Sequence, residues 1–340
     1  MWLGVENATR AAGCLIAAAI VAAVAVCICA APIWRLYAWL PAESLRSDRL
    51  RITHALATRW LHDVPDIILV GGSQVREIVP DDEFASAQLS AACGRPVRFL
   101  NAASSAQLME TSWAIVDHFA ARPPALVVIG TNLWRVTDDA TSRGELARSL
   151  FLLPRAHTMP ADARALPMSL MAREKARLGI ASADVLTALG FGSDRAFVRA
   201  DAFQARQHQY LGPGWTPERK TIDIRFQILE SREVPDSALQ ANVESYREFA
   251  ASLAARGSRT SFLVTPYSPE AGEPLREWES RLSAALESLS RAGAVLDLRN
   301  APDLVTADFF DTVHLVSSGR RKLWPTIKAD LLSQLPGCHT

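Results

Sequence analysis

The chain has 340 residues, of which 49% are hydrophobic and 21% charged, and its 36 Lys and Arg residues balance 36 Asp and Glu residues. This composition is typical of a folded protein and excludes a largely disordered one. The zero net charge argues against a nucleic-acid-binding protein, which normally carries a basic surface, and the sequence contains no nucleic-acid-binding motif.

The first element in chain order is an apolar stretch at 11–34, which contains no charged residue and lies between Arg10 and Arg35. As a helix it would be about 36 Å long, enough to cross roughly 30 Å of hydrocarbon. The alternatives are a buried helix of a soluble protein and a cleaved signal peptide ending near 29–31. The stretch is longer than a usual signal-peptide core, and Pro32 would follow the cut. We therefore expect residues 1–35 to form a short tail and a retained transmembrane anchor.

Charges flanking this stretch do not settle its orientation. Arginines are more numerous after it than before it, so the positive-inside rule would place the large domain in the cytoplasm. That rule is weak for long translocated domains.

The cysteines and histidines give little further guidance. Three of the five cysteines lie in the apolar stretch, and Cys93 and Cys338 either pair in an oxidising compartment or remain free thiols. The histidines are scattered and no Cys/His cluster is present, so we predict no metal site.

After a helical stalk expected at 36–63, residues 64–335 alternate between short apolar runs and stretches with helical spacing, and 336–340 form a tail. Alternation of this kind predicts an α/β domain with a parallel sheet. The five expected strands lie at 67–70, 97–100, 126–129, 262–265 and 294–298. In the last helix, Pro325 should cause a kink or mark the true start.

The regular alternation of strands and helices is interrupted between the third and fourth expected strands. The stretch from about 133 to 235 is longer than one crossover requires, is mostly helical in pattern, and contains an expected loop at 211–220. We interpret about 136–235 as a helical insert or lid, with a second small domain as the alternative.

Ligands of parallel α/β sheets bind beyond the carboxyl ends of the strands, where this sequence carries groups suited to acyl transfer. Ser73 follows a Gly-Gly turn as the candidate nucleophile, and His314 as base stands three residues from Asp311 as its orienting acid. The Asn132 side chain and the backbone N–H groups of Ser73 and of a residue near Ala103 could stabilise an oxyanion. Each feature alone also fits a turn, a cap or a surface hydrogen bond; their order along one sheet favours a site.

Four short segments that carry these residues resemble the conserved motifs of the SGNH (GDSL-like) hydrolases. The resemblance lies in 69-LVGGS-73, 99-FLNAASSA-106, 130-GTNL-133 and 311-DTVH-314, and it covers roughly 64–125 and 258–335. It implies a three-layer α/β/α domain whose catalytic residues are Ser73, His314 and Asp311, with Ser73, Ala103 and Asn132 at the oxyanion, and no cofactor.

Three positions depart from the family pattern: Gly72 replaces Asp, Ala103 replaces Gly and Leu133 replaces Asp. The first is tolerated in membrane-anchored relatives, such as the D-alanine transfer protein of teichoic acid synthesis and proteins that O-acetylate exported polysaccharides. The resemblance thus implies an extracytoplasmic serine esterase or O-acyltransferase, acting on an acylated polysaccharide or other glycan, often beside a multi-span membrane acyltransferase. The alternative that the departures motivate is an inactive binding or assembly subunit of an envelope-polysaccharide complex.

Four further residues near the strand ends are weaker substrate-binding candidates. Arg76 could meet an anionic substrate or pair with Glu77 or with an Asp at 81–82. Trp134 and Tyr267 could stack on a sugar or close the core. Asn101 belongs to the second family-like block.

Overall fold

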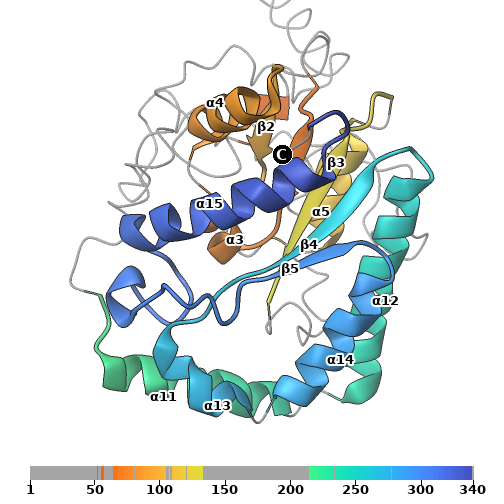
Figure 1. Cartoon of the computed structure of the whole chain (residues 1–340). Coiled ribbons are helices and arrows are strands. Elements are labelled where there is room, and N and C mark those ends of the chain that lie inside the picture. Colours follow the sequence, from red (N-terminus) through yellow and green to blue (C-terminus); the bar gives the residue numbers. More distant parts are fainter. Residues whose placement is uncertain are drawn as a thin grey trace, which may run out of the picture.

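The structure is a computed structural model of the chain (Figure 1), and it describes residues 52, 55–56, 64–79, 81–104, 107, 109–119, 121–132, 214–232, 235–276 and 278–338. Within these ranges, none of the helices has both the length and the apolar character needed to cross a membrane. The anchor expected at 11–34 lies outside the described residues.

One five-stranded parallel sheet forms the centre of the domain, in the spatial order β2-β1-β3-β4-β5. The expected parallel α/β sheet is therefore confirmed. Three of its strands, β1, β2 and β3, are fully buried, as their nearly continuous apolar sequences predict for strands covered on both faces. The strands are β1 (Ile67–Val70), β2 (Phe99–Asn101), β3 (Leu126–Thr131), β4 (Arg259–Val264) and β5 (Ala294–Asp297).

Helices pack on both faces of this sheet because successive strand side chains point to opposite sides. In β1, Ile68 and Val70 pack with α5 (Met109–Asp117), α12 (Asp236–Ala254) and α14 (Glu279–Ser290). Ile67 and Leu69 pack with α3 (Ser73–Ile78), α4 (Asp82–Cys93) and α15 (Ser317–Gln334) on the other face. The two helical layers lie on either side of the sheet in Figure 1, an arrangement consistent with a three-layer α/β/α architecture.

The last helix, α15, buries the apolar stripe that its sequence predicts. Leu323, Ile327 and Leu331 are all less than 5% exposed and belong to the core on the face of the sheet that α3 and α4 also cover. Pro325 lies within the continuous helix and does not mark its start.

Three residues of the expected stalk are described, and all three are helical. Ile52 and Leu56 are buried in the core that α5 and α12 share, and Ala55 packs against it. His118, which follows α5, is buried, and burial lowers the pKa of its imidazole to about 4. The rest of the segment at 36–63 lies outside the described residues.

The end of the expected insert is described from Gly214 onward. Helix α11 (Pro217–Arg232) begins inside the stretch expected to be a loop at 211–220, so that expectation is wrong from Pro217 on. Proline suits the first position of a helix because its missing N–H would have no intrahelical acceptor there. The remainder of the insert lies outside the described residues. Three short elements complete the fold: η4 (Pro269–Ala271), α13 (Gly272–Arg276) and η5 (Thr306–Asp308).

A disulfide joins Cys93 to Cys338, whose Cα atoms are 4.6 Å apart although 245 residues separate them in the chain. Cys93 is the last residue of α4, and Cys338 follows α15 and is buried. The bond therefore attaches the C-terminal end of the domain to the helix that follows the Ser73 segment.

We expect the double substitution Cys93→Ser and Cys338→Ser to lower the free energy of unfolding by about 2–4 kcal/mol, because it removes a cross-link that restricts the unfolded chain. Urea unfolding of the oxidised and reduced wild-type protein provides the matched comparison. Equal stability of the oxidised and reduced forms would contradict the prediction.

Candidate active site

The topology brings three chain segments to one edge of the sheet. β1 lies between β2 and β3, so the connections leaving β1 and β3 diverge at this point, where ligands of such sheets bind. Ser73 begins α3 just beyond β1, and Asn132 directly follows β3. His314 lies in the loop between β5 and α15.

Two glycines allow α3 to lie close to the strand ends. Gly71 has φ +146°, and a Cβ atom there would lie 2.9 Å from Val75 Cγ2. A Cβ on Gly130, at the end of β3, would lie only 2.0 Å from the same methyl group. Both positions therefore require glycine so that the first turn of α3, which carries Ser73, can sit against β1 and β3.

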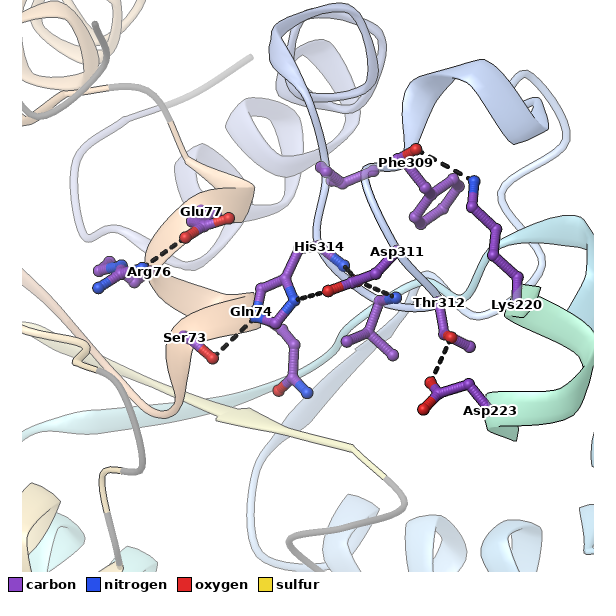
Figure 2. A network of polar contacts seen from close by, with 12 residues as sticks. Ser73, Gln74, Arg76, Glu77, Lys220, Asp223, Phe309, Asp311, Thr312 and His314 are labelled. Carbon is purple, nitrogen blue, oxygen red and sulfur yellow. Dashed lines mark hydrogen bonds and ion pairs between the residues drawn. The ribbon is translucent and has the colours of Figure 1, made fainter. Parts of the chain in front are cut away.

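Ser73, His314 and Asp311 form one hydrogen-bonded line (Figure 2). Ser73 Oγ is 2.9 Å from His314 Nε2, and His314 Nδ1 is 2.7 Å from Asp311 Oδ2. The second oxygen of Asp311 accepts the backbone N–H groups of Val313 and His314 at 2.9 and 2.8 Å. These two bonds fix the plane of the carboxylate and so the orientation of the imidazole.

The loop that carries the acid and the base closes on itself. We call residues 309–315 the histidine loop. Phe309 and Leu315 form an isolated antiparallel bridge, and both side chains are buried. The backbone N–H of Phe310 donates to the carbonyl of His314 at 2.8 Å. The acid and the base are thus held in a tight turn anchored by apolar residues.

Side chains of helix α11 bind the histidine loop and the residues leading into it from outside (Figure 2), and so does the backbone of Trp215, just before the helix. Lys220 is 1% exposed, and its ammonium donates to the carbonyls of Thr306 at 2.8 Å and Phe309 at 3.1 Å. Thr312 donates its hydroxyl to Asp223 at 2.5 Å. The backbone N–H of Trp215 donates to the carbonyl of Phe310 at 2.7 Å. The C-terminal part of the expected insert therefore contacts the loop directly.

The buried position of Lys220 influences its protonation. Burial lowers the pKa of the Lys220 ammonium, and the nearby carboxylates of Glu270 and Asp311 only partly counteract this.

Electrostatics favour a charged imidazole at His314. Burial opposes its protonation, but the hydrogen bond and charge of Asp311, together with the charge of Glu77, outweigh burial and raise the pKa of His314. Burial likewise disfavours an ionised Asp311, yet the bonds from His314 and from two backbone N–H groups lower the pKa of that carboxyl. Asp311 therefore stays ionised and stabilises an imidazolium.

A buried ion pair stands behind Ser73 on α3. Arg76 and Glu77 are 3% and 0% exposed, and Arg76 Nη2 lies 2.5 Å from Glu77 Oε1. Their opposite charges act in opposite directions on the pKa of His314. Removing either partner would take this opposite charge away from a buried ionised group, which is costly.

Two of the three donors expected to stabilise an oxyanion make hydrogen bonds within the protein. Asn132 Nδ2 donates to the carboxamide oxygen of Gln74, and the Ala103 N–H donates to Asn101 Oδ1 at 3.2 Å. The N–H of Ser73, at the first position of α3, has no acceptor within its helix.

Three of the four weaker substrate-binding candidates are described, and all three are buried. Arg76 is buried and paired with Glu77, so its alternative interpretation holds. Asn101 is 1% exposed and donates to the Arg76 carbonyl at 2.9 Å, so it connects β2 to α3 and does not face a substrate. Tyr267 is buried with Val313 and Trp278 in a small core under the histidine loop. Trp134 lies outside the described residues.

Three residues at the site were not predicted: Gln74, Lys220 and Asp223. Gln74 follows the serine, but nothing in the local sequence indicates its partner. Lys220 and Asp223 lie about ninety residues before the histidine loop, and only the tertiary packing of α11 brings them to it.

No known protein-family model matches this sequence, and no curated protein matches it either. Among the residues described, no group of three or more His, Cys, Asp and Glu side chains could hold a metal ion.

We expect His314 to titrate above the ordinary histidine pKa of about 6.5 and Asp311→Asn to lower that pKa, because the substitution removes the charge that stabilises the imidazolium. NMR titration of the ring protons measures both values, and His118, with its lowered pKa, serves as an internal reference. An unchanged midpoint for His314 in the variant would contradict this.

We expect Lys220→Met to lower the free energy of unfolding by about 1–3 kcal/mol, because two carbonyls next to the histidine loop lose a buried donor. Urea unfolding measures the change. Arg225→Met, at an exposed position of the same helix, is the control and should have little effect. Equal stability of the two variants would show that the buried ammonium does not hold the loop.

Proposed function

We propose that the chain is a membrane-anchored serine esterase or O-acyltransferase of the SGNH type, acting on acyl esters of a cell-envelope or exported polysaccharide. The observation that carries the proposal is the line of hydrogen bonds from Ser73 through His314 to Asp311 at the switch point of a parallel sheet. A serine becomes a nucleophile when a base accepts its proton and a third group orients the base.

In the proposed reaction, His314 Nε2 takes the Ser73 hydroxyl proton as Oγ bonds to the acyl carbonyl carbon. The negative charge that develops on the carbonyl oxygen is stabilised by the Ser73 N–H and by Asn132. The tetrahedral intermediate collapses, the bond to the leaving oxygen or sulfur breaks, and His314 returns the proton to that atom.

The second half of the proposed reaction releases the acyl group. Water or a sugar hydroxyl attacks the acyl-Ser73 ester and gives its proton to His314, which then reprotonates Ser73 as it leaves. Asp311 stabilises the imidazolium in both halves. Since His314 must be neutral to accept a proton, and its pKa is raised, activity should fall as the pH drops through that raised pKa.

The disulfide supports an extracytoplasmic location for the domain. Disulfides persist in oxidising compartments and are rare where cellular thiols keep cysteines reduced. The Cys93–Cys338 bond therefore favours the side of the membrane opposite to the one that the flanking arginines suggest. A multi-span membrane acyltransferase is the proposed partner, as a donor of acyl groups to such an anchored domain.

A second candidate is an inactive binding or assembly subunit of a polysaccharide-modifying complex. The observation that favours it is the internal engagement of two expected oxyanion donors, Asn132 and Ala103. Hydrogen-bonded donors in a free enzyme can be released on substrate binding, whereas a domain without catalytic function would have no need to release them.

Reaction with a serine-directed fluorophosphonate and modification of the polymer in cells separate the two candidates. We expect the purified full-length protein to be labelled, and Ser73→Ala to lose labelling and to lower acyl-ester turnover by about 10³- to 10⁶-fold. Ser333→Ala, at an exposed position of α15, is the matched control and should behave as wild type. An unlabelled wild-type protein, together with full polymer modification by Ser73→Ala in cells, would rule out the enzyme and leave the assembly subunit.

A further inference from the structure

The amide of Asn132 and the side chain of Gln74 meet beside the candidate nucleophile. Gln74 directly follows Ser73 in the first turn of α3, as Figure 2 shows, and Asn132 directly follows β3, the neighbour of β1. Asn132 is 1% exposed and donates its amide N–H to the carboxamide oxygen of Gln74. A polar group one residue from Ser73 therefore occupies one of the two amide N–H donors of Asn132, beside the place that a carbonyl bound to Ser73 would take.

We propose that Gln74 caps the oxyanion site: its carboxamide oxygen takes the place of the substrate oxygen on Asn132 and has to move aside for reaction. This inference rests on the proposed function, because it assigns the resting state of the same site. Gln74 is half-buried, and in the part of the chain that the structure describes its side chain makes this one hydrogen bond. The cap can thus rotate away without breaking a second hydrogen bond to a described residue.

A second expected oxyanion donor, the Ala103 N–H, also makes a hydrogen bond to a side-chain oxygen of the protein. The Ala103 N–H is directed to Asn101 Oδ1, and Asn101 is held in turn by the Arg76 carbonyl. Asn101 is fixed in the core, whereas Gln74 lies at the site and carries no second anchor among the described residues. Gln74 is therefore the group whose movement can expose a donor.

The acceptor strengths of the competing oxygens decide when Gln74 is displaced from Asn132. An amide oxygen is a better acceptor than the carbonyl oxygen of an ester, so a substrate in its ground state displaces Gln74 poorly. A hydrogen bond to an ionised acceptor is about twice as strong as one between neutral groups, so the oxyanion displaces it well. The cap should therefore slow reactions with small esters and other reagents that bring no further binding energy.

Rates of fluorophosphonate labelling and of p-nitrophenyl acetate hydrolysis by the full-length protein test the cap. In labelling, Ser73 Oγ bonds to phosphorus, fluoride leaves and His314 takes the proton, while the phosphoryl oxygen needs the oxyanion donors. We expect Gln74→Ala to react about two- to tenfold faster, which corresponds to the loss of one neutral hydrogen bond. Gln74→Glu should react more slowly than wild type, because a carboxylate holds Asn132 more strongly and repels the oxyanion.

A double-mutant comparison assigns the effect to Asn132. Asn132→Ala should react about 10²- to 10³-fold more slowly, as expected for loss of an oxyanion donor. Adding Gln74→Ala to it should bring no increase, because the bond that the cap occupies is already absent. Gln88→Ala, at an exposed position of α4, controls for loss of a carboxamide elsewhere and should leave the rate unchanged.

Each outcome decides the matter, and two of them separate the cap from the catalytic role. Labelling of wild type with an equal or lower rate for Gln74→Ala would overturn the cap and leave the nucleophile intact. Absence of labelling in every variant would overturn both. Independently of reactivity, the side-chain amide resonances of Asn132 should shift in Gln74→Ala, and unchanged resonances would also overturn the cap.

Discussion

The hydrogen bond between Ser73 Oγ and His314 Nε2 joins residues that are 241 positions apart in the chain, and the candidate site depends on it. The sheet makes this contact possible by placing the exit of β1 next to that of β3, at one edge with the histidine loop. Each partner is then held locally. Ser73 stands on a turn that two glycines bring against the strands, and His314 stands on a loop whose acid is fixed by the loop's own N–H groups.

Support for the base comes from a part of the chain that the family-like motifs do not include. The ammonium of Lys220, the carboxylate of Asp223 and the N–H of Trp215 all bind the histidine loop or the residues leading into it. A shift of α11 would therefore move the acid and the base relative to the serine. In this way α11, at the described end of the connection between β3 and β4, is mechanically coupled to the proposed chemistry.

The site combines a poised base with internally occupied oxyanion donors. The pKa of His314 is raised by Asp311, so the imidazolium that the proposed acyl transfer would need is stabilised. Asn132 and Ala103 meanwhile donate to side-chain oxygens of the protein. A domain that transfers acyl groups to a chosen acceptor benefits from such a resting state, because water and small esters then find fewer available donors.

The sequence by itself determined the parallel α/β sheet and which residues follow its strands, because hydrophobic periodicity and buried apolar runs are local features. It also indicated Ser73, Asp311 and His314, since the carboxyl ends of parallel strands lie at one edge of a sheet, where residues that follow different strands can converge. Tertiary structure alone decided the roles of the neighbours. Asn101 donates to the Arg76 carbonyl of α3, and Gln74 meets Asn132, because these partners are set by packing between distant segments and not by spacing along the chain. Arg76 and Glu77 are neighbours in the chain, and tertiary packing buries them as an ion pair. The pairing of Cys93 with Cys338 was likewise open until the packing of α4 against the chain end brought the two together.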